Sequence, residues 1–321
     1  MNAGRGDGRG GSGPRRGGGG RSGGKGSRGG PSRGDAGGPR RAGGSRRGAS
    51  PAPRSGRPSP GGPGRRGDGR EERQKGPGGD QVEGRHAVRE LLLAGRRRVR
   101  EVFMAADLDP APIVDEIREL AAEARVGITE LSRTKFESIT KTESSQGVMA
   151  RADPLPDLDL DDLLARSEGV PFLLVLDGIT DPGNLGAMLR TGICAGVTGV
   201  VLPRHRSARI TPTVTKAAAG AIEHLPVATV SGIPAALGDL ASRGVWSVGL
   251  DAVADTSVYD MAVSDAPVAL VLGAEGRGLS RLARERCDLV VTIPLQGPLA
   301  SLNVGAAAAV ACFEVARRRA T

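Results

Sequence analysis

The feature that most constrains the fold is a strict alternation of apolar strands and helical segments through residues 171–321. Runs such as "PFLLVLD" are apolar at almost every position, which is typical of strands covered on both faces. Six strands are predicted, at 171–177, 198–203, 225–230, 245–251, 266–273 and 288–294, with helices between them, including one over 211–224. Such alternation predicts a mostly parallel α/β sheet between two layers of helices.

A smaller α/β unit is predicted over residues 81–152, before a linker at 153–170. It begins with a helix in "VEGRHAVRELLLAG", which Gly95 can terminate. The linker "DPLPDLDLDDLLARSEG" is rich in proline and aspartate, with a short helix expected at its end. We therefore expect two folded segments, 81–152 and 171–321, joined by 153–170.

Residues 1–80 form a basic tail that cannot fold alone. The tail holds 30 of the 51 glycines and no aromatic residue, so it cannot bury enough apolar surface to offset chain entropy. It carries 19 Lys and Arg against 6 Asp and Glu, whereas the remainder carries 26 against 30, a net charge of −4. The tail is either a polycation that attracts RNA phosphates, which the sign bias favours, or a solubilising extension.

Composition also bounds the compartment and the cofactors. The cysteines, Cys194, Cys287 and Cys312, show no C-x-x-C pairing, and their odd number argues against a disulfide framework. No apolar leader segment or membrane-spanning run is present, so we expect a reduced, cytoplasmic protein without a membrane partner. The three histidines are dispersed, so no metal site is expected.

Three predicted strand ends break the apolar pattern, at 178–196, 270–280 and 293–305. The carboxyl ends of parallel strands meet at one edge of a sheet, where ligands bind. Each break has a simple structural explanation, because Asn184, Ser301 and Asn303 could cap helices and Arg190 could be a solvated charge. Together they favour a site, since their glycines and prolines are costly unless a special backbone is needed.

These stretches resemble the three ordered motifs of the SpoU/TrmH (SPOUT) family of RNA ribose 2′-O-methyltransferases. The motifs are "NLGAMLR" from Asn184 to Arg190, "GAEGRG" from Gly273 to Gly278, and "IPLQGPLASLN" from Ile293 to Asn303. The resemblance covers residues 82–321. It implies a C-terminal trefoil-knot domain, a small L30e-like RNA substrate-binding domain and a homodimer whose active site is completed across the interface.

The resemblance also implies S-adenosylmethionine as cofactor and a division of roles among the motif residues. The cofactor-binding residues would be Gly273, Gly276, Ile293, Leu295, Leu302 and Asn303. The catalytic set would be Arg190, Asn184, Glu275, Ser301 and Asn303. We expect Arg190 to engage a phosphate and steady the developing oxyanion. A phosphate, a water or a transiently deprotonated arginine would take the 2′-hydroxyl proton, because Arg normally stays protonated.

In the catalytic set, Asn184 and Asn303 would orient Arg190 or the ribose, Ser301 would donate to phosphate, and Glu275 would orient its neighbours. RNA contact is predicted at Arg204, Arg206, Arg209 and Lys216, which follow the same sheet edge. For the basic run 96–100, RNA contact and a solvated turn are equally good readings. The favoured substrate is a guanosine of 23S rRNA. The alternatives are tRNA, another rRNA site, or a non-catalytic RNA-binding factor in ribosome assembly.

Overall fold

The computed structural model describes residues 76–142, 145–262 and 265–320. The tail was predicted over residues 1–80, and residues 1–75 of it lie outside the described residues. Residues 76–80 do take part in the fold, since Gly78 N–H donates to the carbonyl of Ile210 and Leu155 N–H donates to that of Pro77.

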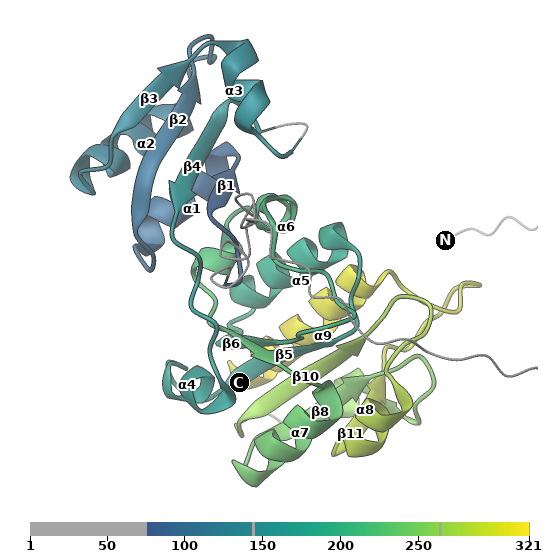
Figure 1. The fold of residues 1–321 in the computed structure, drawn as a ribbon. Coiled ribbons are helices and arrows are strands. Elements are labelled where there is room, and N and C mark those ends of the chain that lie inside the picture. Colours follow the sequence, from purple (N-terminus) through teal and green to yellow (C-terminus); the bar gives the residue numbers. More distant parts are fainter. Residues whose placement is uncertain (1–75, 143–144, 263–264, 321) are drawn as a thin grey trace, which may run out of the picture. The chain divides into compact units, whose positions relative to one another are not determined.

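A seven-stranded sheet forms the centre of the C-terminal half (Figure 1). Its order is β7-β6-β5-β10-β8-β11-β9, and every pairing is parallel. The strands are β5 (Phe172–Asp177), β6 (Gly199–Pro203), β7 (Val227–Val230), β8 (Trp246–Leu250), β9 (Thr256–Ser257), β10 (Val268–Gly273) and β11 (Leu289–Thr292). The six predicted strands are confirmed, and the two-residue β9 was not foreseen. The order agrees with the knotted α/β fold that the resemblance implies.

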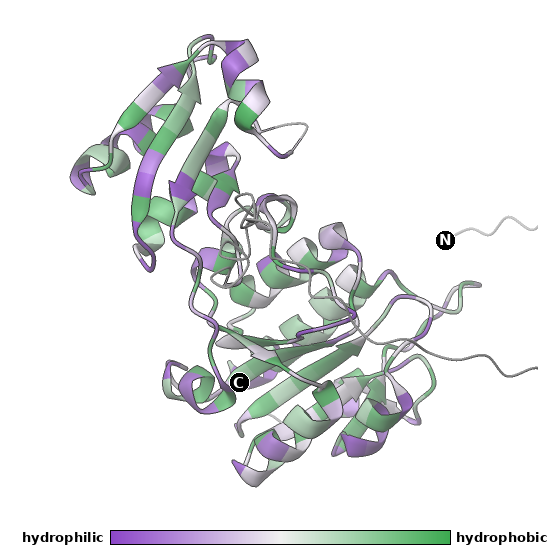
Figure 2. Cartoon of the chain, in the orientation of Figure 1, coloured by the Kyte–Doolittle hydropathy of each residue, from purple (hydrophilic) through white to green (hydrophobic). Residues whose placement is uncertain are grey.

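Helices cover both faces of this sheet. They are α4 (Leu160–Ala165), α5 (Pro182–Cys194), α6 (Pro212–Ala217), α7 (Ile233–Ser242), α8 (Arg281–Arg286) and α9 (Val304–Arg319). Along β5, Leu174 packs with α5, α6 and α9, whereas Leu173 and Val175 pack with α4, α7 and α8. Figure 2 shows the central strands as predominantly hydrophobic, as their burial on both faces requires.

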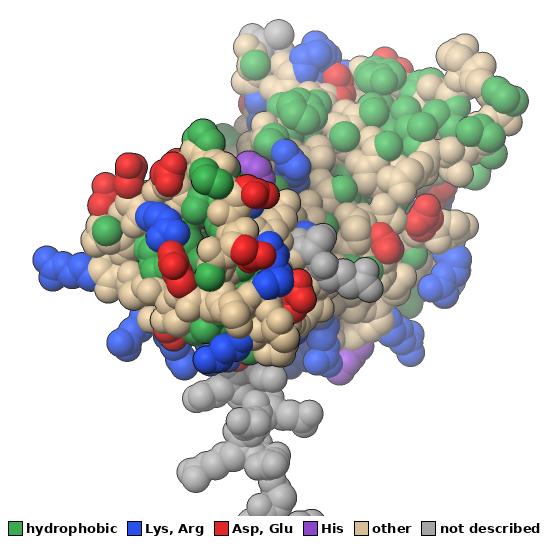
Figure 3. All heavy atoms as spheres, turned by 90° about the horizontal axis from the view of Figure 1, so that it is seen from above, with side chains coloured by type: hydrophobic (Ala, Val, Ile, Leu, Met, Phe, Trp, Pro, Cys, Tyr) green, Lys and Arg blue, Asp and Glu red, His purple; other side chains and the backbone are tan. Residues whose placement is uncertain are grey.

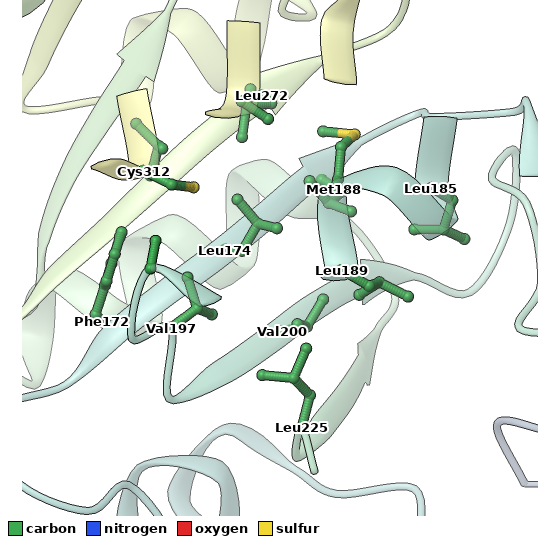
Figure 4. Close-up of a cluster of buried hydrophobic side chains, with 14 of the residues drawn as sticks. Phe172, Leu174, Leu185, Met188, Leu189, Val197, Val200, Leu225, Leu272 and Cys312 are labelled. Carbon is green, nitrogen blue, oxygen red and sulfur yellow. The ribbon is translucent and has the colours of Figure 1, made fainter. Parts of the chain in front are cut away.

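The core beneath α5 positions the helix that carries the first motif. Leu185, Met188 and Leu189 point from α5 into the cluster formed with β5, β6, β10 and α9, and all three are fully buried (Figure 4). Because these positions face inward, Arg190 is left on the exposed side of the same helix. Helix α5 also approaches α6 closely at Gly186, where a Cβ atom would lie 2.5 Å from the Cβ of Ala217.

The N-terminal four-stranded sheet has the order β1-β4-β2-β3. Its strands are β1 (Gln81–Glu83), β2 (Val99–Ala105), β3 (Ile128–Leu131) and β4 (Val148–Ala152), and its helices are α1 (Arg85–Ala94), α2 (Pro112–Glu123) and α3 (Arg133–Ile139). Helix α1 ends at Gly95 in the left-handed conformation, as predicted. Phe136 and Ile117 are fully buried, so this sheet has a core of its own.

The helix predicted over 211–224 is wrong in length. Helix α6 stops at Ala217, because Ala219 and Gly220 take left-handed φ values of 50° and 83°. A short 3-10 helix then covers Ala221–Glu223. A Cβ atom on Gly220 would lie 2.6 Å from the Cβ of Glu90, so the break brings this turn against helix α1. No helix among the described residues is both long enough and apolar enough to span a bilayer.

Candidate functional site

The first motif begins at a tight turn after β5. Gly178 takes a φ of 80°, and the chain enters α5 with Pro182 in its first turn. The N-cap is Asp181, whose carboxylate accepts the backbone N–H of Asn184 at 2.6 Å. The helix-cap reading of Asn184 is therefore wrong, because Asp181 performs that role three residues earlier. The side chain of Asn184 is left to interact elsewhere.

A chain of hydrogen bonds joins the three motifs. Asn184 Nδ2 donates to Glu275 Oε2 at 2.9 Å, and Asn303 Nδ2 donates to Asn184 Oδ1 at 2.9 Å. Asn303 Oδ1 in turn caps α9 by accepting the N–H groups of Gly305 and Ala306, at 2.9 and 3.2 Å. Asn184 thus fixes the orientation of two side chains, those of Glu275 and Asn303, which lie 91 and 119 positions away from it in sequence. Asn303 caps its helix as expected, whereas Ser301 lies before the helix begins.

The glycines of the second motif fold the chain after β10 back on itself. A Cβ atom on Gly273 would lie 2.0 Å from the carbonyl carbon of Gly278, so only glycine fits there. Gly276 and Gly278 have φ values of 77° and 65°, which favour glycine. We call residues 274–278 the divider loop. Its ends are held together by the N–H of Gly278, which donates to the carbonyl of Ala274 at 2.8 Å.

A cavity of about 660 Å³ lies beside the divider loop, over the carboxyl ends of β8, β10 and β11. All the residues expected to bind the cofactor line it, together with three of those expected to be catalytic: Gly273, Gly276, Ile293, Leu295, Leu302, Asn303, Glu275 and Ser301. Leu250 and Leu299 add apolar walls, and the glycines leave backbone groups accessible. The size and the apolar lining with few polar groups suit a small-molecule cofactor.

S-adenosylmethionine fits the chemistry of this lining. Its adenine is a flat apolar ring with polar edges, which apolar side chains and free backbone groups can hold. Leu295, Leu299 and Leu302 are 38, 76 and 43 % exposed, so the apolar wall is open to a ligand. Among the described residues, no group of three or more His, Cys, Asp or Glu could hold a metal ion.

Arg190 does not line this cavity. It is exposed on α5 and has no hydrogen-bond or ion-pair partner among the residues described. Helical geometry places it about 120° around the axis from Asn184. The structure thus brings Glu275, Asn184 and Asn303 together. Ser301 lines the same cavity as Glu275 and Asn303, whereas Arg190 of the same chain does not.

The residues predicted to contact RNA lie on the loop after β6 and on α6. Arg204, Arg206 and Arg209 are exposed, and Lys216 is half-buried. Lys and Arg side chains are interspersed with Asp and Glu on the face drawn in Figure 3, so this face carries no single large basic surface. Contact with an RNA backbone would depend on local clusters such as this loop.

Part of the basic run 96–100 is structural, which sequence reasoning did not anticipate. Arg97 and Glu223 are buried and form a bidentate pair, with Nε–Oε2 and Nη2–Oε1 distances of 2.9 and 2.5 Å. Arg100 pairs with Asp153 at 2.6 Å. Neither a solvated turn nor RNA contact describes Arg97. Nothing in the local pattern could have indicated a partner 126 residues away.

Comparison with known proteins gives concordant matches for both parts of the chain. A model of the SpoU rRNA Methylase family matches residues 171–313, and a model of RNA 2′-O ribose methyltransferase substrate binding matches residues 81–158. The 23S rRNA (guanosine-2′-O-)-methyltransferase RlmB of Pseudomonas aeruginosa is 41 % identical over 243 residues, covering 75 % of this chain and 97 % of that protein. The protein of the same name from Ralstonia nicotianae is 42 % identical, covering 74 and 94 %.

Solved structures show the same fold. The SpoU methyltransferase AviRb from Streptomyces viridochromogenes, in complex with AdoMet, superposes with a TM-score of 0.64 at 25 % identity, covering 75 % of this chain and 90 % of that one. A TrmH-family RNA methyltransferase described as putative, from Porphyromonas gingivalis, gives 0.61 at 28 % identity, covering 74 and 90 %.

Proposed function

This chain belongs to the SpoU rRNA methylase family, and we propose that it methylates the ribose 2′-hydroxyl of a guanosine in 23S rRNA. The chain is an RNA 2′-O-methyltransferase that uses S-adenosylmethionine. The observation that carries the proposal is the hydrogen-bond chain from Glu275 through Asn184 to Asn303, at the rim of a cavity lined by every predicted cofactor residue. The choice of 23S rRNA guanosine rests on relatives about 40 % identical over nearly their whole length.

The cofactor, when bound, supplies a methyl group on a positively charged sulfur. Gly273, Ile293 and Leu302 would hold it through backbone groups and apolar contact. The protein then has to align the 2′-hydroxyl, and alignment alone can account for several kcal/mol of the barrier, about 7–11 in model systems. Asn184 and Asn303 are locked by their mutual bond and by the α9 cap, so the rim of the cavity needs no rearrangement to position a ribose.

Arg190 supplies the positive charge of the active site in this proposal. Its guanidinium engages the phosphate beside the target ribose and stabilises negative charge developing on the 2′-oxygen, because arginine suits bidentate phosphate contact. The proton leaves to that phosphate, to water or to a transiently neutral Arg190. Ser301 is exposed on the cavity and free to donate to a phosphate oxygen.

We further propose that Arg190 acts on the cavity of a second copy in a homodimer. Its separation from the cavity in its own chain supports this arrangement. Exposed apolar side chains, which include Leu299 at 76 % and Phe313 at 50 %, support a subunit contact near the 293–303 loop and α9.

Mapping of 2′-O-methyl positions in rRNA from cells with and without the gene tests the substrate. Loss of one guanosine methylation in 23S rRNA is the expected result, restored by the wild-type gene and not by Arg190→Ala. Loss of methylation confined to tRNA, or to another rRNA position, would identify that RNA as the substrate in place of the 23S rRNA guanosine. An unchanged pattern, with no binding of S-adenosylmethionine by calorimetry, would favour the assembly factor.

A mixing experiment tests whether Arg190 acts across a dimer. Arg190→Ala removes the charge, and Leu302→Glu places a carboxylate in the cofactor cavity, so each variant alone should be inactive. Co-expressed heterodimers regain one intact site if Arg190 acts on the partner's cavity. Purified heterodimers without any activity would show that the residue acts within its own chain.

A further inference from the structure

The sheet edge carries a second cavity on the opposite side of the divider loop. This cavity, of about 810 Å³, lies over the carboxyl ends of β5, β6, β7 and β10, whereas the cofactor cavity lies over β8, β10 and β11. The two cavities share Ala274 and Gly278. The polar residues that line the second cavity are Asp177, His205, Arg206, Ser231, Arg277 and Ser280. Any group held there lies one loop's thickness from the cofactor.

The lining of this cavity is cationic, and its arginines are not engaged. Arg206 and Arg277 are exposed, and neither has a hydrogen-bond or ion-pair partner among the described residues. Other arginines of this domain do have ion-pair partners, as Arg243 has in Asp161 and Arg284 in Asp251. The carboxylate in the lining, Asp177, already accepts the N–H of Ser280 at 2.8 Å. Two guanidinium groups therefore remain for a ligand.

The loop that presents Arg206 is tied to its neighbours. Arg204 N–H donates to the carbonyl of Val230 at 2.8 Å. The N–H of Ala208 and the hydroxyl of Ser207 both donate to the carbonyl of Ile179, at 2.7 and 3.1 Å. Arg206 itself takes a left-handed φ of 60°, which costs an L-residue about 1–2 kcal/mol. The fixed loop holds Arg206 on the cavity wall despite that cost.

We propose that this second cavity binds a phosphodiester of the RNA strand next to the nucleotide being methylated, with Arg206 and Arg277 as its phosphate ligands. The proposal rests on the methyltransferase function proposed above. Guanidinium groups bind phosphate through two parallel hydrogen bonds, which fix orientation as well as position. The cavity exceeds a phosphate in volume, so it also has room for the attached nucleoside. Anchoring the strand on one side of the divider loop places the adjacent ribose against the cofactor on the other.

The first test removes each guanidinium charge. Arg206→Gln and Arg277→Gln are compared with Arg286→Gln. Arg286 is exposed, its side chain has no partner among the described residues, and it lines neither cavity. The probe is an unmodified 23S rRNA transcript, bound over a range of salt concentrations. Each pocket variant should lower the slope of log affinity against log salt by about 0.7–0.9. KM for the transcript should rise about tenfold, the loss of one charge-assisted bond, while affinity for S-adenosylmethionine stays near wild type.

A second pair of variants tests the cavity without removing an arginine. Ser231→Glu places a carboxylate at the cavity wall and should weaken transcript binding, whereas Ser231→Ala removes the same hydroxyl without adding charge and should bind normally. Wild-type slopes and KM values in Arg206→Gln, Arg277→Gln and Ser231→Glu, from an enzyme that methylates the transcript, would overturn the cavity assignment alone. Wild-type protein that binds RNA with arginine-dependent slopes yet transfers no methyl group would refute the methyltransferase proposal and support the cavity.

Discussion

Replacing Gly273 with alanine tests whether the divider loop depends on a close backbone approach. The added Cβ would lie 2.0 and 2.1 Å from the carbonyl carbon and oxygen of Gly278, and 2.2 Å from the nitrogen of Leu279. These are backbone atoms, so no side-chain rotation relieves the overlap. Even a tight contact needs 3.0 Å, so the loop must move by about 1 Å. Overpacking of this kind costs about 1–3 kcal/mol, which lowers Tm by roughly 2–12 °C in a protein of this size.

The same shift should damage ligand binding, because the divider loop is a wall of the cofactor cavity. We expect Gly273→Ala to bind S-adenosylmethionine at least about tenfold more weakly, a change of about 1.4 kcal/mol measured by calorimetry. The control is Gly238→Ala in α7, where the new Cβ meets only Arg286 Nη1, at 3.9 Å, and the helix gains propensity. If both variants keep wild-type Tm and affinity, the divider loop does not depend on a close backbone approach at Gly273.

Three further predictions concern the rest of the chain. Arg97→Ala strands the buried carboxylate of Glu223, so the free energy of unfolding should fall by about 3–5 kcal/mol in denaturant titrations, and a loss below about 1 kcal/mol would contradict this. Hydrogen bonds from Arg317 lower the pKa of Glu314 to about 2. The free energy of unfolding should therefore fall by about 1–3 kcal/mol as pH falls from about 4.5 to about 2, and Glu314→Gln should remove that pH dependence. Deleting residues 1–75, which hold 19 Lys and Arg, should reduce the salt dependence of RNA binding, and an unchanged slope would show that the tail makes no phosphate contacts.

The sign of the pH effect follows from the direction of the Glu314 shift. A carboxyl group whose pKa is lowered on folding stabilises the native state above its unfolded pKa. That stabilisation disappears as acid protonates the group in the native state too. The partner Arg317 is 60 % exposed, so solvent screening keeps the contribution below the value that the whole shift would imply.

Periodicity and motif order were sufficient for the architecture and for bringing the residues expected to bind the cofactor to one cavity. Apolar runs predicted six strands of the large sheet, because burial on both faces leaves a local signature in each strand. The residues expected to bind the cofactor come from two segments, 273–276 and 293–303, at the carboxyl ends of β10 and β11. The carboxyl ends of parallel strands lie at one edge of the sheet. Segments that end or follow different strands therefore lie close together in the structure.

Other features depended on contacts between segments distant in sequence. The helix predicted over 211–224 broke at Ala219 and Gly220, where the chain lies against α1. Arg97 is likewise buried because it pairs with Glu223, which is distant in sequence. Local propensity predicts helix length and side-chain exposure poorly where a segment distant in sequence packs against the residues concerned.

Local sequence patterns encode a parallel α/β sheet with irregular, glycine- and proline-containing segments at one edge, because strand burial and glycine positions are local properties. The way in which those segments divide the edge depends on contacts between parts of the chain that are distant in sequence. The steric fit of Gly273 against Gly278 folds residues 274–278 into a wall between two cavities. Asn184 donates a hydrogen bond to Glu275 and accepts one from Asn303, which joins the segments that follow three separate strands. Such contacts are set by distances between backbones far apart in sequence, which no local pattern records.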